Sequence, residues 1–167
     1  CNGDSDGKFY AHVNGGTPPY IYAWTGPNGF TATTYNYNDS ITGLLAGTYS
    51  VTVIDSKGCT LTPLSVTLID PSPITITTNP TPASCFGYAD GTITVTNTTG
   101  GTPSYISYTW DPNTMQTGTN ATSLLAGVYT VTVTDDNGCI ATAQDIVTEP
   151  SAPTMSITST NPLISSN

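Results

Sequence analysis

Two stretches of the chain alternate strictly between apolar and polar residues, and they are nearly the same stretch. They read LLAGTYSVTVIDSKGC at Leu44–Cys59 and LLAGVYTVTVTDDNGC at Leu124–Cys139. Alternation with a period of two places one set of side chains on each face of a strand, so each stretch predicts a half-buried β-strand. The Asn137-Gly138 pair that follows the second strand favours a type I′ hairpin turn.

The same two stretches supply most of the predicted core. In each, a Tyr follows Leu-Ala-Gly-x, which looks like the tyrosine corner of immunoglobulin-like sandwiches, whose hydroxyl bonds the backbone upstream. An aromatic strand earlier in each copy adds a Trp to the core. The predicted structural core residues are Trp24, Tyr49, Val51 and Val53 in the first copy, and Trp110, Tyr129, Val131 and Val133 in the second.

The repeat predicts an all-β chain with two tandem immunoglobulin-like β-sandwich domains. We call residues 1–70 repeat 1 and residues 71–150 repeat 2, and expect residues 151–167 to be a linker and the first strand of a following repeat. Repeat 1 has no counterpart of the strand around Ile74 and Ile76, so we expect its first strand to be missing. The chain is therefore expected to be part of a longer array.

The charge balance of the chain limits which classes of partner are expected. The chain has 2 Lys and Arg residues against 11 Asp and Glu residues, a net charge of −9. Nucleic acids and anionic membranes both attract basic surfaces, so neither is an expected partner. No apolar run is long enough to predict membrane insertion. Few lysines and four spaced cysteines favour an oxidising, extracellular setting.

Four cysteines, Cys1, Cys59, Cys85 and Cys139, allow three pairings. Cys85 lies between the first and second strands of its sandwich, and Cys139 follows the final hairpin turn. Those loops sit at opposite ends of a sandwich, about 20 Å apart for a six-residue strand, whereas a disulfide needs Cα atoms within about 7 Å. Head-to-tail stacking favours Cys1–Cys139 across the domain junction and leaves Cys59 and Cys85 for other repeats. The rival pairing, Cys1–Cys59 with Cys85–Cys139, stays open.

The residue types argue against catalysis. His12 is the single His and Glu149 the single Glu, so neither a Ser-His-Asp arrangement nor a carboxylate pair can be assembled, and we expect no enzyme. Asp4 and Asp6 resemble the start of a calcium loop, but the bidentate Glu at the twelfth position is lacking. We therefore expect turn-forming aspartates and no cofactor, with calcium as the alternative.

The motifs of both copies resemble the SprB repeat family. They are Cys-x-Gly, Gly-Gly-Thr-Pro-x-Tyr at Gly15–Tyr20 and Gly100–Tyr105, the Trp, Leu-Ala-Gly-x-Tyr, Asp-x-x-Gly-Cys and a closing Glu-Pro, which is Asp70-Pro71 in repeat 1. The resemblance implies large extracellular cell-surface adhesins of Bacteroidota, exported by type IX secretion and in the named member moved in gliding motility. It suggests a structural and adhesive shaft module of a long surface filament, with neighbouring copies as head-to-tail partners. The alternative is a module for cell adhesion that binds surface glycans, proteins or other cells.

Two features extend this interpretation. Asp39-Ser40-Ile41 resembles the Asp-Ser-apolar O-glycosylation site of Bacteroidota, which makes Ser40 a candidate for modification. Tyr35 and Tyr37 are not repeated, and they predict either sugar stacking or edge-strand packing. If chains of this kind assemble, a free strand at Thr154–Thr158 is expected to complete repeat 1 of the next copy by strand addition.

Overall fold

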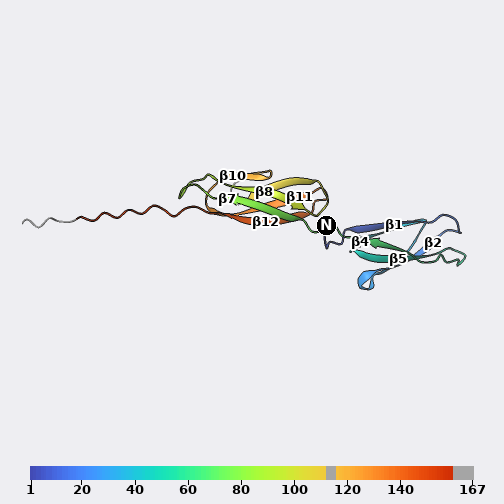
Figure 1. The fold of residues 1–167 in the computed structure, drawn as a ribbon. Helices are drawn as coiled ribbons and strands as arrows, with labels where there is room; N and C mark the ends of the chain where they lie inside the picture. The colour runs from blue at the N-terminus through green and yellow to red at the C-terminus, as the bar shows by residue number, and fades with distance from the viewer. Residues whose placement is uncertain (112–115, 160–167) are drawn as a thin grey trace, which may run out of the picture. The chain divides into compact units, whose positions relative to one another are not determined.

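The computed structural model describes residues 1–111 and 116–159, and they form an all-β fold (Figure 1). The predicted fold class is confirmed. A short 3-10 helix, Pro27–Gly29, follows the second strand. The strands are β1 (Gly7–His12), β2 (Tyr20–Thr25), β3 (Thr31–Asn36), β4 (Asn38–Leu44), β5 (Gly47–Ile54), β6 (Leu64–Leu68), β7 (Thr75–Thr81), β8 (Gly91–Thr99), β9 (Tyr105–Asp111), β10 (Asn120–Leu124), β11 (Gly127–Asp135) and β12 (Ile140–Val147).

Contacts between Cα atoms divide the chain into two compact units. Unit 1 consists of Cys1–Thr75, Thr98–Ile106 and Val133–Ala141, and unit 2 consists of Ile76–Asn97, Ser107–Thr132 and Thr142–Asn167. Each sheet nevertheless takes all its strands from one repeat. Strands therefore pair only within a repeat, although the two compact units do not follow the boundaries of the repeats.

The strands of repeat 1 form a two-stranded sheet, β1-β4, and a four-stranded sheet in the order β3-β2-β5-β6. The pairs are antiparallel, and Trp24 on β2 lies opposite Val51 on β5. Every second residue of β5 is buried because its apolar side chains all point to one face. The buried core consists of Tyr20, Tyr22, Trp24, Ile41, Leu44, Tyr49, Val51 and Val53.

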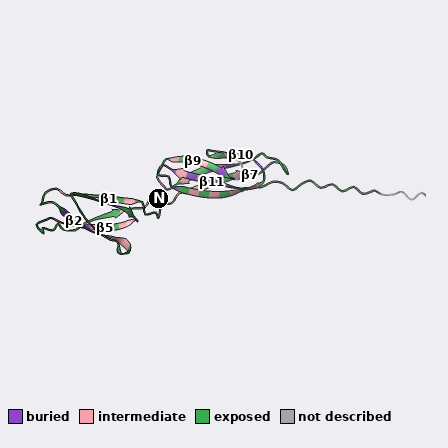
Figure 2. Ribbon diagram, turned by 180° about the vertical axis from the view of Figure 1, so that it is seen from behind, coloured by how far each residue is buried: buried purple, intermediate pink, exposed green. Residues whose placement is uncertain are grey.

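The strands of repeat 2 form two three-stranded sheets, in the orders β10-β8-β7 and β12-β11-β9. Buried residues again alternate with less buried ones along β11, which is labelled in Figure 2. The side chains predicted for both cores are buried. In repeat 2 the buried apolar residues include Ile93, Val95, Trp110, Ala121, Leu124, Tyr129, Val131, Val133 and Val147.

Both tyrosine corners form the expected hydrogen bond. The Tyr49 hydroxyl donates to the Leu45 carbonyl at 2.9 Å, and the Tyr129 hydroxyl donates to the Leu125 carbonyl at 3.0 Å. Each Tyr therefore ties the start of its strand to the segment before it. Both Tyr side chains are buried, and their hydrogen bonds are partly shielded from water.

The predicted type I′ turn is wrong. The Gly138 amide donates to the Asp135 carbonyl at 3.0 Å and the Asp135 amide to the Cys139 carbonyl at 2.9 Å, so the turn has one more residue than a two-residue loop. Of its residues only Gly138 has a positive φ, 81°. The Asp135 side chain bonds the Asn137 amide and keeps Asn137 right-handed, which favours a type I turn closed by a Gly bulge.

The strand expected at Thr154–Thr158 does not form. Residues 151–159 have no regular secondary structure and are exposed along their length (Figure 2). The remainder of the predicted segment, residues 160–167, lies outside the described residues. A strand is stabilised by pairing, and the described part of this chain provides no partner for the segment.

Candidate functional site

The turn that ends β11 is joined to the start of the chain by a disulfide bond. Cys1 and Cys139 are bonded with their Cα atoms 5.3 Å apart, and both residues belong to unit 1. Cys59 and Cys85 are exposed free thiols. The structure therefore has the pairing that sandwich topology favoured, and it has neither bond of the rival pairing.

An aspartate caps the turn that precedes Cys139, and another caps the turn that precedes Cys59. The Asp135 carboxylate accepts the amides of Thr102, Asn137 and Cys139 at 2.8, 3.0 and 2.8 Å. These three hydrogen bonds, that of Thr102 first, hold the pKa of Asp135 below its usual value because they favour the charged form. The link of Asp135 to Thr102 depends on tertiary contact, so local sequence does not predict it.

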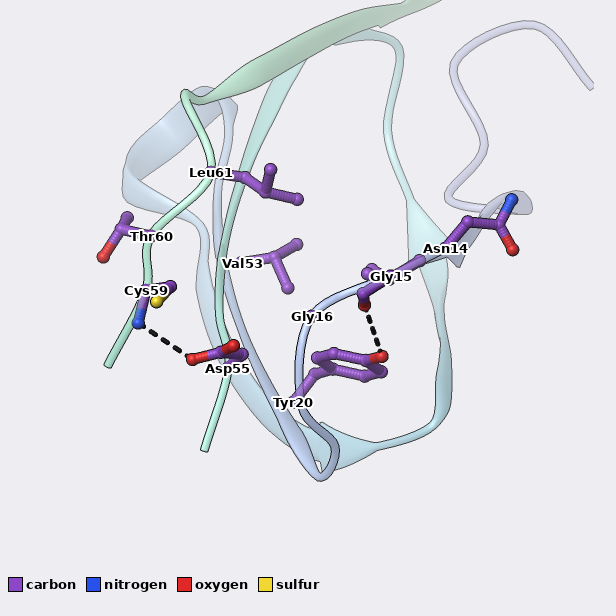
Figure 3. A pocket seen from close by; sticks show the side chains of 10 residues that line it. Asn14, Gly15, Gly16, Tyr20, Val53, Asp55, Cys59, Thr60 and Leu61 are labelled. Carbon is purple, nitrogen blue, oxygen red and sulfur yellow. Dashed lines mark hydrogen bonds between the residues drawn. The ribbon is translucent and has the colours of Figure 1, made fainter. Parts of the chain in front are cut away.

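Repeat 1 has the same capped turn. Asp55 accepts the amides of Thr17, Lys57 and Cys59 at 3.0, 2.9 and 2.9 Å. Its pKa is also lowered, with the Cys59 amide as the largest cause. Figure 3 shows the Cys59–Asp55 bond at the edge of a pocket of about 110 Å³, beside Tyr20, whose hydroxyl donates to the Gly15 carbonyl.

The Gly-Gly pair beside each capped turn is covered in one repeat and open in the other. The Gly101 amide donates to the Ser72 carbonyl at 2.7 Å, and a Cβ on Gly100 would lie 2.0 Å from the Pro73 carbonyl oxygen. A Cβ on Gly15 would have no neighbouring atom within 4 Å. The close approach that makes glycine necessary in repeat 2 therefore has no counterpart in the described part of repeat 1.

The two Cys-x-Gly loops occupy equivalent local positions. The Gly3 amide donates to the Asp70 carboxylate at 2.8 Å, and the Gly87 amide donates to the Glu149 carboxylate at 2.6 Å. The acidic residue of the closing Asp-Pro or Glu-Pro pair thus binds the loop of its own repeat. The sequence showed this acid in both repeats, but its partner only becomes visible in the fold.

A groove of about 400 Å³ lies beside β1 in repeat 1. We call it the β1–β6 groove; it is lined by Phe9–Asn14, Trp24, Val51, Val53, Leu61, Thr62, Leu64 and Val66. Apolar side chains on one wall are unusually exposed, at 70% for Leu64 and 39% for Val66. Both residues lie on β6, and nothing in the described chain covers them.

The Trp of each core has a different partner. The Trp24 indole donates to the buried carboxylate of Asp39 at 2.7 Å, and the Thr34 hydroxyl donates to the same oxygen. In repeat 2 the Trp110 indole donates to the Gly118 carbonyl at 3.0 Å. Asp39 has no equivalent in repeat 2, so the repeated pattern does not mark it as a partner of the core Trp.

The remaining candidates lie apart from one another. Ser40 is exposed on β4, opposite Tyr10 of β1, so its glycosylation stays a prediction. His12 is exposed and its imidazole bonds the side chains of Asn38 and Asn14. Glu149 is occupied by Gly87. The structure does not bring these residues together.

The candidate calcium residues lie close to Cys1. Asp4, Asp6 and the Cys1 sulfur form the cluster with metal-ligand spacing that the described residues contain. The Cys1 sulfur belongs to a disulfide, and the Asp6 carboxylate accepts a hydrogen bond from the Cys1 amino group. A disulfide sulfur is not the thiolate that binds metals, so two separate carboxylates are what this loop can offer a cation.

The described chain is all-β, and no helix in its described part is long and apolar enough to cross a membrane. The solved structures it resembles include the amphioxus IgVJ-C2 molecule, at 18% identity over 89% of this chain and 98% of that one, with a TM-score of 0.38. A segment of two fibronectin type-III domains from chicken tenascin gives 14% identity, 87% and 94% coverage and a TM-score of 0.34.

A family model also matches two parts of the chain. The SprB repeat model matches residues 1–29 and 77–115, one segment in each repeat. The resemblance seen in the motifs of both copies is thereby confirmed. No curated protein matches the chain.

Proposed function

We propose that this chain is a structural, adhesive shaft module of a long repetitive filament on the surface of a bacterial cell. SprB repeats are cell-surface adhesin repeats, which agrees with an extracellular location. The proposal extends to the setting that the resemblance implies: Bacteroidota, type IX secretion and, for some members, gliding. In this proposal the module is not an enzyme and its partners are copies of the same repeat.

The observation that supports the shaft most directly is the repetition of structural contacts. The Asp-capped turn, the tyrosine corner and the acid-to-Cys-x-Gly bond each occur once per repeat. A ligand-binding module concentrates its chemistry at one site, whereas a shaft repeats the contacts that hold each copy and its neighbour. Here the capped turn, the tyrosine corner and the bond to the Cys-x-Gly loop are all repeated.

The disulfide suggests how a shaft would bear load. Cys1 and Cys139 are separated by 138 positions in sequence and joined by one covalent bond. A force applied at the two chain ends passes through that bond, so most of both sandwiches lies outside the stretched path. The strands other than β12 (Ile140–Val147) are thereby protected from being unfolded by tension.

Single-molecule stretching of the whole chain tests this function. Under oxidising conditions we expect only the segment after Cys139 to extend, and a reductant should release roughly 450 Å more at about 3.3 Å per residue. Full extension of the oxidised chain at low force would contradict the shaft. A Cys59→Ser variant is the matched control, because that thiol is free.

A glycan array separates the shaft from the alternative function. Tyr35 and Tyr37 are 68% and 69% exposed, which is the observation that favours sugar stacking. Tyr37 also packs edge-on against Tyr20, with ring centroids 6.5 Å apart. The shaft predicts no glycan binding above background. Binding that is lost in Tyr35→Ala and retained in the exposed control Tyr10→Ala would establish a glycan-binding module instead.

A further inference from the structure

We infer that the β1–β6 groove of repeat 1 is an acceptor site for a β-strand, and that its occupant is the segment Thr154–Ser159 of a second copy of this chain. The inference names the partner of the proposed shaft and rests on that function. It starts from the sheet order: β1 pairs with β4, and its other edge is unpaired among the described residues. An unpaired edge exposes backbone donors and acceptors to an incoming strand.

Repeat 2 shows what belongs at this edge. Its strand β8, which starts with Gly91 as β1 starts with Gly7, has β10 on one side and β7 on the other. A Cβ on Gly7 would meet Leu68 and Leu44; a Cβ on Gly91 would meet Val147, Leu124 and, in addition, the Thr81 carbonyl of β7. The surroundings therefore match except for β7. Among the described residues, no strand occupies this position in repeat 1.

Burial confirms the match between the open groove and β7. Ile93 and Val95 of β8 are 0% and 8% exposed, whereas the corresponding Phe9 and Ala11 of β1 are only half-buried. On the opposite wall, the Thr78 hydroxyl of β7 donates to Asp145 of β12 at 2.8 Å. In repeat 1 the strand that corresponds to β12 is β6, and its Leu64 and Val66 side chains are exposed.

The groove continues into the pocket of Figure 3. In repeat 2 the chain entering β7 lies over the Gly-Gly pair, and Ile74 would contact a Cβ on Gly101 at 2.6 Å. In repeat 1 the equivalent Gly15-Gly16 pair is open, and it lines the pocket together with Val53 and Leu61 (Figure 3). One continuous site thus runs from this pocket along β1, and Asp55 is the acidic residue among those that line it.

The segment after repeat 2 has the features of β7. Residues 151–167 resemble Ser72–Ser84, and Thr154–Ser159 reads TMSITS, with the same alternation as the start of β7. Ile74 and Ile76 face inward in repeat 2 and are half-buried. In the segment after repeat 2 the alternating apolar side chains are Met155 and Ile157, and they are 85% and 82% exposed. An uncharged, alternating segment without a partner therefore matches a groove without a strand, and burying both side chains supplies the driving force.

The free thiols report the orientation of this contact. Cys85 occupies the Cys-x-Gly loop as Cys1 does, and Cys59 follows the capped turn as Cys139 does. Since Cys1 of repeat 1 bonds Cys139 of the next repeat, Cys85 of a donor copy should meet Cys59 of the acceptor copy. Glutathione disulfide can oxidise that pair: each thiol loses a proton, the pair gives up two electrons, and two glutathione thiols are released.

The test is assembly of the full chain in a glutathione redox buffer, followed by analytical ultracentrifugation and peptide mapping without reduction. We expect concentration-dependent oligomers and a Cys59–Cys85 linkage between copies. Met155→Ser with Ile157→Ser should weaken association at least tenfold, as should Leu64→Lys. These side chains are exposed, so the variants keep their fold, which circular dichroism verifies.

Matched controls lie on the outward faces. Ser156→Asn with Thr158→Asn on the tail, and Ser65→Lys on β6, should assemble as the parent chain does. A monomeric parent chain at about 1 mM would overturn the inference, as would equal cross-linking of the Met155/Ile157 variant. Predominant Cys59–Cys59 or Cys85–Cys85 linkage would also overturn it. Each of these results would leave the force-extension test of the shaft unaffected, so the two failures are distinguishable.

Discussion

The Cys139 amide donates a hydrogen bond of 2.8 Å to the Asp135 carboxylate, so the residue that caps the turn also positions the sulfur that bonds Cys1. The same carboxylate reaches the Thr102 amide of a loop 33 residues away. One side chain therefore binds the hairpin turn, the loop that follows the Gly-Gly pair and the backbone of the disulfide-bonded Cys139. Asp55 repeats the arrangement around the free Cys59.

The Asp135 cap predicts a specific dependence of stability on pH. Its folded-state pKa is lowered below the usual 3.8, so its contribution is fully present above that value and is lost as the pH falls through the folded pKa. Asp135→Asn should lower the midpoint of urea denaturation at pH 7, and its deficit should shrink below pH of about 3.8. Asp136→Asn, at the exposed neighbouring position, is the control. An equal deficit at all pH values would contradict the electrostatic role.

The Cys1–Cys139 bond is expected to stabilise the whole chain. In the chain-entropy model, a bond that closes a loop of this length restricts the unfolded chain by up to about 5 kcal/mol. Cys1→Ser, or addition of a reductant, should lower the melting temperature measured by calorimetry. The control, Cys59→Ser with Cys85→Ser, removes only free thiols and should leave the monomer's melting temperature unchanged. A reductant effect of the same size on the Cys1→Ser variant would argue against this bond as the cause.

The Trp24–Asp39 hydrogen bond predicts an asymmetry between the repeats. Asp39→Ala leaves the buried Trp24 indole without its acceptor, which typically costs about 1–3 kcal/mol. Denaturation followed by Trp fluorescence should show a destabilised repeat 1. Trp24→Phe in the Asp39→Ala background removes the orphaned donor, so the double variant should lose less than the sum of the single changes. Additive losses would show that the two residues act independently.

Calcium is expected to have no effect on stability. With Cys1 in a disulfide and Asp6 bonded to the Cys1 amino group, Asp4 and Asp6 are a poor calcium site. The melting temperature should be the same in millimolar calcium and in a chelator. A calcium-dependent increase that disappears in Asp4→Asn would show that the loop does bind the ion.

Local patterns in the sequence predict much of the structure within each repeat. Alternation in Gly47–Ile54 and Gly127–Asp135 predicted the buried faces of both strands, because strand geometry converts a period of two directly into two faces. The repeated Leu-Ala-Gly-x-Tyr motif predicted both tyrosine corners. The Asn137-Gly138 pair did not predict the turn type correctly, because the Asp135 side chain accepts a hydrogen bond from an amide of the turn.

The relationships between distant residues become visible only in the folded chain. The pairing of Cys1 with Cys139, the contact of Asp135 with Thr102 and the burial of Asp39 beneath Trp24 all join positions whose distance depends on sheet topology. The open edge of β1 is of the same kind. The sequence indicated that a strand was missing from repeat 1, but the fold shows where Leu64 and Val66 are left uncovered. Local pattern specifies which face of a strand is apolar; only packing specifies whether another strand covers that face.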